Sequence, residues 1–318
     1  MKAIVLKQAG GIENLDIREV PVPAIADNEV LVRNRSLSIN PVDVQVRKVE
    51  DSLKNIVQPK AGEDIILGWD LSGVVEATGK AVTRFKAGDE VFGMANFPGH
   101  GKAYAVYTAV PENHLALKPA NISHESAAAA TLAALTAWQA LVTYGKIKKG
   151  DKVLIHSAAG GVGHYAVQIA KHFGAYVIGS SSAAKKDAVL GYGADEHIDY
   201  HQQAFDELVH DADIVVDAIP EPGHLERSLK TLKEGGCLIS LRSFPDEELK
   251  RAAADKRVDL QRMLVTSNGE DMESLAALLG AEELKSDVSA AYRFEEMGKA
   301  HEQVATGRTR GKVVVNVN

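Results

Sequence analysis

The segment VLIHSAAGGVGHYAVQIAKHFGA, residues 153–175, joins an apolar run, a glycine-rich turn and an amphipathic helix pattern. Ala158, Gly160 and Gly163 give the turn a G-x-G-x-x-G spacing with alanine in the first place. Small residues are needed there because the backbone turns tightly and approaches a pyrophosphate at a helix N-terminus. The alternative is a turn that only packs closely. Because the turn follows a strand and opens a helix, the segment predicts a dinucleotide site.

The rest of the second half alternates strand and helix patterns. The apolar runs are KVLIHSA, AYVIGSS, EHIDY, DIVVDAI, GCLISL and VDLQRMLV. Six strands separated by helices predict a doubly wound, parallel six-stranded sheet of the Rossmann type. In the first helix Val162, Ala166, Ile169 and Phe173 form an apolar stripe, and His164 is expected on the wetter side.

The first 120 residues carry a different pattern. Short apolar runs are interrupted by Gly and Pro, which predicts a mostly β, partly open barrel. An Ala-rich helix pair follows, and the chain closes with two helices and the strand KVVVNV. We expect the last part to return to the first domain. The predicted domains are therefore 1–120 with 266–318, and 121–265, in an α/β protein.

Composition excludes several classes of protein. The chain has 318 residues, 45% hydrophobic and 25% charged, with a net charge of −7 and no Lys/Arg run, so we expect no nucleic-acid partner. The apolar runs fall short of the ~20 residues of a membrane helix, and MKAIVLKQAGG has no signal-peptide core. Cys237 is the one cysteine, in a strand pattern, which excludes an intrachain disulfide and a cysteine zinc cluster. These features indicate a soluble cytoplasmic protein.

The end of the second strand indicates which cofactor is used. It reads Ser180-Ser181-Ser182, followed by Lys185 and Lys186, and the first acid is Asp187 in the next helix. Hydroxyls and an ammonium suit a 2′-phosphate, whereas the NAD pattern has a carboxylate there. Alternatively, Ser182 only caps the helix. The pattern favours NADPH.

Several motifs together resemble the medium-chain dehydrogenase/reductase superfamily, in its zinc-free quinone oxidoreductase and enone reductase branch. They are SINPVDVQVR, GWDLSGVVEATG with FKAGDEVFG, AAAATLAALTAWQAL, AAGGVGHYAVQIAKHFGA and TGRTRGKVVV. The resemblance implies a GroES-like domain beside the Rossmann domain. It also implies NADPH-dependent hydride transfer to quinones or to α,β-unsaturated carbonyls such as enones and 2-alkenals.

The resemblance assigns the cofactor residues by position. Gly160, Gly161, Val162 and Gly163 match the pyrophosphate turn; Ser181, Ser182, Lys185 and Tyr200 match the surroundings of the 2′-phosphate; Thr136 and Leu241 match residues beside the nicotinamide. For Tyr200, packing at a strand end is an equal alternative.

The zinc ligands of related alcohol dehydrogenases have no counterpart. Their cysteine and histidine positions fall here at or beside Asn40 and at Trp69, and the eleven histidines show no H-x-H or H-E-x-x-H spacing. We therefore expect no metal. Reduction of an electron-poor carbon needs no Lewis acid, because hydrogen-bond donors can stabilise the oxygen that gains charge.

Asn40 and Asp43 are the candidate catalytic residues. Asn40 matches the position that contacts the substrate oxygen in the family. Both residues also fit a helix start, Asn40 as N-cap and Asp43 in the first turn. Asp70 is interpreted as a turn or hydrogen-bonding residue near Gly73.

The segment after this motif departs from typical quinone oxidoreductases. Residues 50–64, EDSLKNIVQPKAGED, lack the tyrosines expected there, which favours enones and 2-alkenals over quinones, and they predict a mobile loop. The alternatives to a reductase are a non-catalytic NADPH-binding redox sensor and a divergent alcohol dehydrogenase. A homodimer paired through the last Rossmann strand, VDLQRMLV, is implied by resemblance.

Overall fold

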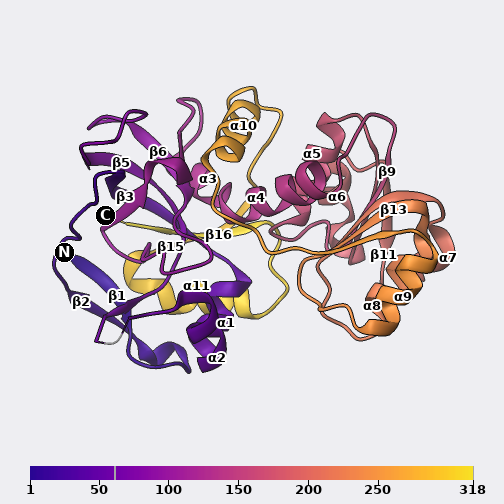
Figure 1. Ribbon diagram of the computed structural model, residues 1–318, viewed down its shortest axis with the longest axis horizontal. Coiled ribbons are helices and arrows are strands. Elements are labelled where there is room, and N and C mark those ends of the chain that lie inside the picture. The colour runs from indigo at the N-terminus through magenta and orange to yellow at the C-terminus, as the bar shows by residue number, and fades with distance from the viewer. Residues whose placement is uncertain (61, 318) are drawn as a thin grey trace. The chain divides into compact units, whose positions relative to one another are not determined.

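A computed structural model describes residues 1–60 and 62–317 of the chain, and both halves contain helices and strands (Figure 1). The chain forms two compact units, residues 1–135 together with 265–318, and residues 136–264. Among the described residues, none of the helices is both long and apolar enough to cross a membrane.

The second unit is built on a parallel six-stranded sheet in the order β11-β10-β9-β12-β13-β14. The strands are β9 (Lys152–Ile155), β10 (Tyr176–Ser181), β11 (Glu196–Asp199), β12 (Ala212–Asp217), β13 (Leu232–Ser240) and β14 (Asp259–Arg262). Between them lie α5 (Gly163–His172), α6 (Lys186–Gly191), α7 (Phe205–Leu208), α8 (His224–Thr231) and α9 (Glu247–Asp255). This strand order is that of the predicted doubly wound Rossmann sheet, which is confirmed.

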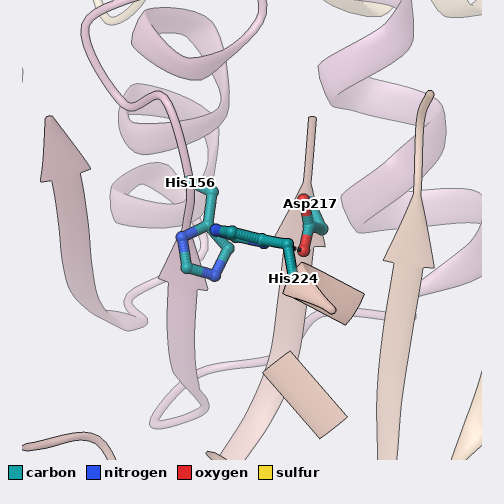
Figure 2. Close-up of side chains that lie close together, drawn as sticks. All are labelled: His156, Asp217 and His224. Atoms are coloured by element: carbon teal, nitrogen blue, oxygen red, sulfur yellow. Dashed lines mark hydrogen bonds and ion pairs between the residues drawn. The ribbon is translucent and has the colours of Figure 1, made fainter. Parts of the chain in front are cut away.

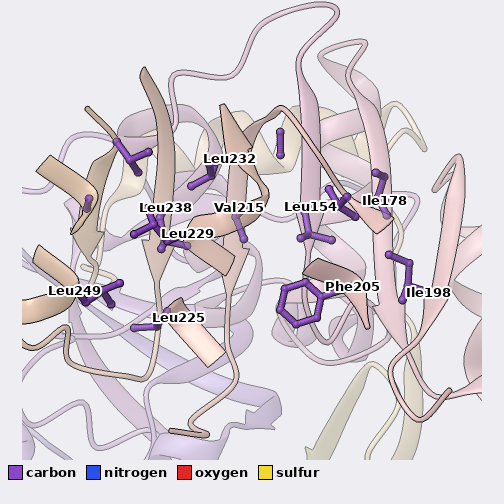
Figure 3. Packing of buried hydrophobic residues seen from close by; sticks show 14 residues of the cluster. Leu154, Ile178, Ile198, Phe205, Val215, Leu225, Leu229, Leu232, Leu238 and Leu249 are labelled. Carbon is purple, nitrogen blue, oxygen red and sulfur yellow. The ribbon is translucent and has the colours of Figure 1, made fainter. Parts of the chain in front are cut away.

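A row of apolar residues across the strands forms part of the hydrophobic core of the second unit. Ile178, Leu154, Val215 and Leu238 are register partners on neighbouring strands, and all are buried. Side chains from α7, α8 and α9 pack on them, Phe205 among them (Figure 3). Burying each such side chain stabilises the fold by about 1.5–3 kcal/mol.

Two details of this unit concern earlier expectations. His164 in α5 was expected on the wetter side of the helix, and this is wrong: its ring is buried, bonds the Gly160 carbonyl at 2.9 Å and stacks on Tyr165. This hydrogen bond satisfies the ring nitrogen Nδ1, which lowers the free-energy cost of burying the imidazole. Cys237 is a buried free thiol in β13, as predicted, and burial raises its pKa to about 12.

The first unit contains a seven-stranded sheet in the order β15-β16-β3-β5-β6-β8, with β7 also paired to β3, and a small sheet β2-β1-β4. The strands are β1 (Lys2–Leu6), β2 (Leu15–Glu19), β3 (Glu29–Ile39), β4 (Ile65–Ile66), β5 (Asp70–Thr78), β6 (Glu90–Met94), β7 (Tyr107–Pro111), β8 (Leu115–Leu117), β15 (Val288–Arg293) and β16 (Lys312–Asn316). The mostly β first domain is confirmed, and β15 and β16 return to it from the end of the chain.

The first unit also contains helices. They are α1 (Pro41–Lys48), α2 (Glu50–Ser52), α3 (His124–Ala129), α10 (Gly269–Gly280) and α11 (Met297–Ala305); α4 (Leu132–Trp138) leads into the second unit. Of these, α3, α10 and α11 pack on the strands of the first unit. Single turns η1 (Ile12–Asn14), η3 (Glu112–His114) and η6 (Phe294–Glu296) lie here, and η4 (Gln139–Tyr144) and η5 (Ala183–Lys185) in the second unit. Helix α3 packs on β3, β5 and β16, which places the first part of the Ala-rich helix pair with the β sheet.

The segment 50–64 is more ordered than the sequence indicates. Instead of a loop throughout, it continues α1 into α2 and a π-helical turn, η2 (Leu53–Val57). Leu53 and Val57 are buried, so two apolar side chains anchor the turn. Residue 61 of this segment lies outside the described residues.

Candidate functional site

The glycine turn is held in one conformation between β9 and α5. Ser157 has a φ of 54°, and the Gly160 N–H donates to its carbonyl at 2.8 Å. A Cβ on Gly163 would lie 2.2 Å from the Ser157 carbonyl oxygen and 2.7 Å from the Ala158 Cα. Only glycine fits there, and the first turn of α5 begins at the same residue. The turn therefore has the close approach of backbone to helix N-terminus that a pyrophosphate requires.

The three serines that end β10 have different surroundings. Ser180 is buried and its Oγ lies 3.0 Å from His156 Nδ1, so its hydroxyl is used inside the unit. Ser181 Oγ lies 2.8 Å from His197 Nε2 and donates to the Ser182 carbonyl. Ser182 is half-buried as the N-cap of η5, the turn that carries Lys185. The structure thus brings Ser181, Ser182 and Lys185 together and turns Ser180 away from them.

Tyr200 and His197 complete this end of the sheet. The Tyr200 N–H donates to the Ser181 carbonyl at 3.3 Å, which places the residue beside β10. The residue is 56% exposed and its ring lies against His201, so both packing at the strand end and contact with a cofactor remain open for it. His197 was not predicted from the sequence. It lies in the run EHIDY, which forms β11, and the register of the sheet pairs it with Gly179 of β10.

The remaining predicted cofactor residues lie elsewhere in the chain. Leu241 follows β13, and its N–H donates to the Asp217 carbonyl at 2.8 Å, so it lies at the carboxyl end of the sheet. Thr136 lies in α4 and is 7% exposed. Gly161 and Val162 lie in the turn, Val162 as the N-cap of α5.

One group of side chains in the described part of the chain could hold a metal ion: His156, Asp217 and His224, whose ligand atoms lie within 4.8 Å of one another (Figure 2). Hydrogen bonds already connect them. Asp217 Oδ2 lies 2.7 Å from His224 Nδ1 and accepts from Ser228 Oγ at 2.8 Å. His156 contacts Ser180 through Nδ1 and Ser228 through Nε2. An ion would have to break part of this network.

The network also fixes the state of the His156 ring. Ser228 gives its hydrogen to Asp217, so its oxygen accepts from His156 Nε2, and Nδ1 accepts from Ser180. Burial lowers the pKa of His156 to about 3, which keeps the ring neutral. The group is satisfied as a neutral imidazole beside an ionised, hydrogen-bonded carboxylate.

The candidate catalytic residues lie in a buried polar cluster of the first unit. Asn40 Nδ2 donates to Asp70 Oδ2 at 2.7 Å, and Asn40 Oδ1 accepts from Lys312 Nζ. Lys312 Nζ lies 3.7 Å from Asp70 Oδ2, and the other carboxylate oxygen, Asp70 Oδ1, accepts from the Leu132 N–H. Asp43 Oδ2 accepts from the Asn40 N–H at 2.8 Å, which is the expected capping contact. Asn40 therefore starts α1 while its amide faces two charged groups.

Two hydrogen bonds link Arg47, His301 and Tyr104 in the same cluster. Arg47 Nε donates to His301 Nδ1 at 3.3 Å, so His301 Nε2 carries the hydrogen and donates to the Tyr104 oxygen at 3.0 Å. The second oxygen of Asp43, Oδ1, is buried and has no hydrogen-bond partner among the described residues. Burial, aided by the negative charge of Asp70, raises the pKa of Asp43 to about 7.

The resemblance placed the zinc-ligand positions of related alcohol dehydrogenases at or beside Asn40 and at Trp69. Trp69 is buried, its Nε1–H donates to the Gly99 carbonyl at 2.8 Å, and its ring packs edge-on against Phe97 at 5.0 Å. An indole nitrogen donates only. The Asn40 oxygen faces the Lys312 ammonium. The indole therefore has no lone pair for a cation, and the Asn40 oxygen already accepts from a positively charged group.

Comparison with known proteins agrees with this arrangement. Family models match residues 26–120, described as alcohol dehydrogenase GroES-like domain, and residues 192–315, described as zinc-binding dehydrogenase. The chain is 34% identical to 2-methylene-furan-3-one reductase of Solanum lycopersicum, over 99% of this chain and 79% of that protein. It belongs to the medium-chain dehydrogenase/reductase family.

Within the family, this medium-chain reductase belongs to the branch of quinone oxidoreductases and enone reductases. It is 32% identical to the chloroplastic NADPH-dependent alkenal/one oxidoreductase of Arabidopsis thaliana, over 99% of this chain and 79% of that protein. The structure of the quinone oxidoreductase from Coxiella burnetii matches with a TM-score of 0.90 and 33% identity, over 100% of this chain and 99% of that one.

Sequence reasoning missed part of the buried cluster of this medium-chain reductase. Lys312 could have been suspected, since it is a charge at the start of the apolar run VVV and alternates with Val314 on one side of a strand. Tyr104 and His301 lie 197 positions apart, and nothing local in the sequence links them. Asp70 was considered, but its pairing with Asn40 was not.

Proposed function

We propose that this protein is an NADPH-dependent reductase that transfers hydride to α,β-unsaturated carbonyls or quinones without zinc. Oxidoreductase activity of this kind and the use of NADPH agree with its relatives, an alkenal/one oxidoreductase described as NADPH-dependent and a furanone reductase. The single observation that carries the proposal is the buried Asn40 amide, held between Asp70 and Lys312.

The nucleotide unit fits the proposed cofactor. Gly160 and Gly163 let the turn pack closely on Ser157 at the start of α5, the backbone geometry with which such a turn binds a pyrophosphate, and Gly163 cannot carry a Cβ. Ser181, Ser182 and Lys185 would hold the 2′-phosphate, with hydroxyls and one positive charge and no carboxylate among them. When bound, NADPH supplies the hydride.

The residues of the first unit would stabilise the oxygen that gains negative charge. Asn40 has two amide hydrogens, one of which is given to Asp70. The second is a donor for an enolate or quinol oxygen, an interaction that strengthens as charge develops. The proton that completes an enone reduction can come from water, so no acid side chain is required.

This chemistry is more consistent with the residues than alcohol oxidation is. An alcohol dehydrogenase of this family would polarise the alcohol oxygen with a metal. By resemblance those ligand positions fall at or beside Asn40 and at Trp69, where an indole N–H donates and an amide oxygen faces an ammonium. Zinc-independence is therefore part of the proposal.

The test is NADPH oxidation by purified protein whose metal content has been measured. The substrates are naphthoquinones, short 2-alkenals, cyclic enones and saturated aldehydes, each repeated with NADH. Turnover of enones or quinones with a preference for NADPH supports the proposal, and the panel names the substrate class. Tight NADPH binding without turnover contradicts it and favours a redox sensor. Turnover of saturated aldehydes that depends on zinc favours an alcohol dehydrogenase.

The remaining expectations stay predictions. They are the cytoplasmic location, the absence of a nucleic-acid partner and the domain limits at residues 120 and 265. The homodimer also stays a prediction, and β14 supports it because that strand ends the six-stranded sheet.

A further inference from the structure

The amide of Asn40 lies between two side chains of opposite charge. Its Nδ2 donates to Asp70 Oδ2 at 2.7 Å, and its Oδ1 accepts from Lys312 Nζ. The exposed fractions of Asn40, Asp70 and Lys312 are 2%, 0% and 3%. An ammonium only donates and a carboxylate only accepts, so the amide can take only one of its two orientations.

Lys312 is itself fixed. Its Nζ lies 3.4 Å from the Ile39 carbonyl and 3.7 Å from Asp70 Oδ2. The residue begins β16, and β16 pairs with β3, the strand that ends one residue before Asn40. Two strands and the start of α1 therefore hold the ammonium and the amide together.

The contact with Lys312 also changes the amide as a donor. A positive charge at the amide oxygen draws electron density from the nitrogen, which makes the second N–H a stronger donor. Because the amide is planar, that N–H has a fixed direction once the oxygen and the first hydrogen are held. Orientation and donor strength thus both depend on the pair of charges.

We propose that Lys312 and Asp70 are positioning residues, which orient and polarise the Asn40 amide so that its second N–H meets the oxygen of the reduced substrate. This inference rests on the proposed function. It adds two residues to the reaction that do not touch the substrate themselves.

A purely structural role is the competing explanation, in which Lys312 only balances the buried charge of Asp70. The two explanations differ in the double variant Lys312→Met/Asp70→Asn, which removes both charges at nearly constant volume. Charge balance alone predicts normal stability and normal turnover. Orientation of Asn40 predicts normal stability and lost turnover, because the neutral amide at position 70 can both donate and accept.

The experiment measures Tm, the Kd for NADPH, and kcat and KM with the best enone or quinone. The variants are Asn40→Ala, the double variant, and the triple variant that combines them. Lys118→Met is the matched control, since Lys118 is another lysine of this unit with a 4% exposed side chain, paired with Glu90. It should leave kcat within twofold of wild type.

We expect Asn40→Ala to lower kcat about 100-fold, as the loss of one oxyanion donor does. The double variant should lose at least about 30-fold in kcat, with Tm and the NADPH Kd close to wild type. The triple variant should match Asn40→Ala within about threefold, because the positioning pair acts only through Asn40.

Several results would overturn the inference. One is a double variant with wild-type kcat while Asn40→Ala is impaired. Another is a triple variant whose losses multiply. A third is an active wild type that Asn40→Ala does not impair, which leaves the proposed function standing. An inactive wild type refutes the function and, with it, the inference. Should the double variant not fold, Asp70→Asn alone, which keeps the volume and the Lys312 charge, must lower kcat; unchanged kcat would refute the inference.

Discussion

At the scale of single residues, Ser182 offers a direct test of cofactor choice. It is the N-cap residue of η5 but makes no side-chain cap hydrogen bond, and we propose that it faces the 2′-phosphate of NADPH. Ser182→Asp should lower kcat/KM with NADPH about 100-fold, mainly through KM, because the new carboxylate would repel the 2′-phosphate. It should leave kcat/KM with NADH within a few-fold, because NADH has no 2′-phosphate.

Ser182→Ala is the control for this change. It removes the hydroxyl without adding charge, so its loss with NADPH should stay under about tenfold. Equal losses with NADPH and NADH in Ser182→Asp would mean that this position does not contact the 2′-phosphate.

A buried histidine provides a second residue-scale prediction, on stability against pH. Burial lowers the pKa of His301 to about 3 from an ordinary 6.5. The unfolded chain therefore takes up a proton at His301 below pH 6.5 that the folded protein refuses, and stability present above pH 6.5 is lost as the pH falls toward 3. His301→Gln removes this contribution.

The difference in Tm between wild type and His301→Gln should thus be largest near pH 7 and shrink toward pH 4. His210→Gln changes an exposed histidine and should follow the wild-type curve. A constant difference between wild type and His301→Gln across this range would contradict the assigned pKa.

At the scale of elements, the turn between β9 and α5 has the strictest requirement. Gly163→Ala would place a Cβ 2.2 Å from the Ser157 carbonyl, so the turn must open. We expect at least about tenfold weaker NADPH binding and a Tm lower by several degrees, as strained positions cost about 1–3 kcal/mol.

Gly191→Ala is the matched control in the same unit. Gly191 ends α6 and an added Cβ there meets open space, so the change should be neutral or stabilising by up to about 1 kcal/mol. NADPH fluorescence titration and thermal unfolding measure both variants. Unchanged binding in Gly163→Ala would remove this turn from the proposed cofactor site.

The elements also show what a sequence can and cannot predict. The six strands of the nucleotide sheet were predictable because each is a short apolar run between helical patterns. The helical turn of residues 53–57 was not predictable, because its segment is charged and poor in aromatic residues, and the pattern does not show that Leu53 and Val57 are buried. The wrong placement of His164 has a similar cause: the pattern shows that the residue is polar but not that its ring finds a carbonyl within the helix.

The candidate site divides in the same way. Residues that belong to a local sequence motif, such as Gly163 or Asn40, could be predicted as site residues from that motif. Lys312 meets Asn40 across 272 positions of sequence, and such a pairing follows only from the register of β16 on β3. Long-range charge pairs therefore need the structure.

At the scale of the whole molecule, the prediction concerns metals. Dialysis of the purified protein against a chelator should leave kcat/KM within twofold, since no step of the proposed reaction uses an ion. His224→Gln tests the network with Asp217 and His156 (Figure 2) and should leave metal content unchanged. Activity that chelation removes and zinc alone restores would contradict a zinc-independent reductase.

The order of the units along the chain has a consequence for how the protein is made. The nucleotide unit, residues 136–264, is synthesised whole before β16 leaves the ribosome, whereas β3 waits for β16 as its partner. A unit whose contacts are complete can fold first during synthesis. The β sheet of the first unit closes only afterwards, and Lys312 arrives with its closing strand. A nascent chain can thus present a complete Rossmann sheet while the sheet of the first unit still lacks β16 and Lys312, so the order of translation completes the second unit first.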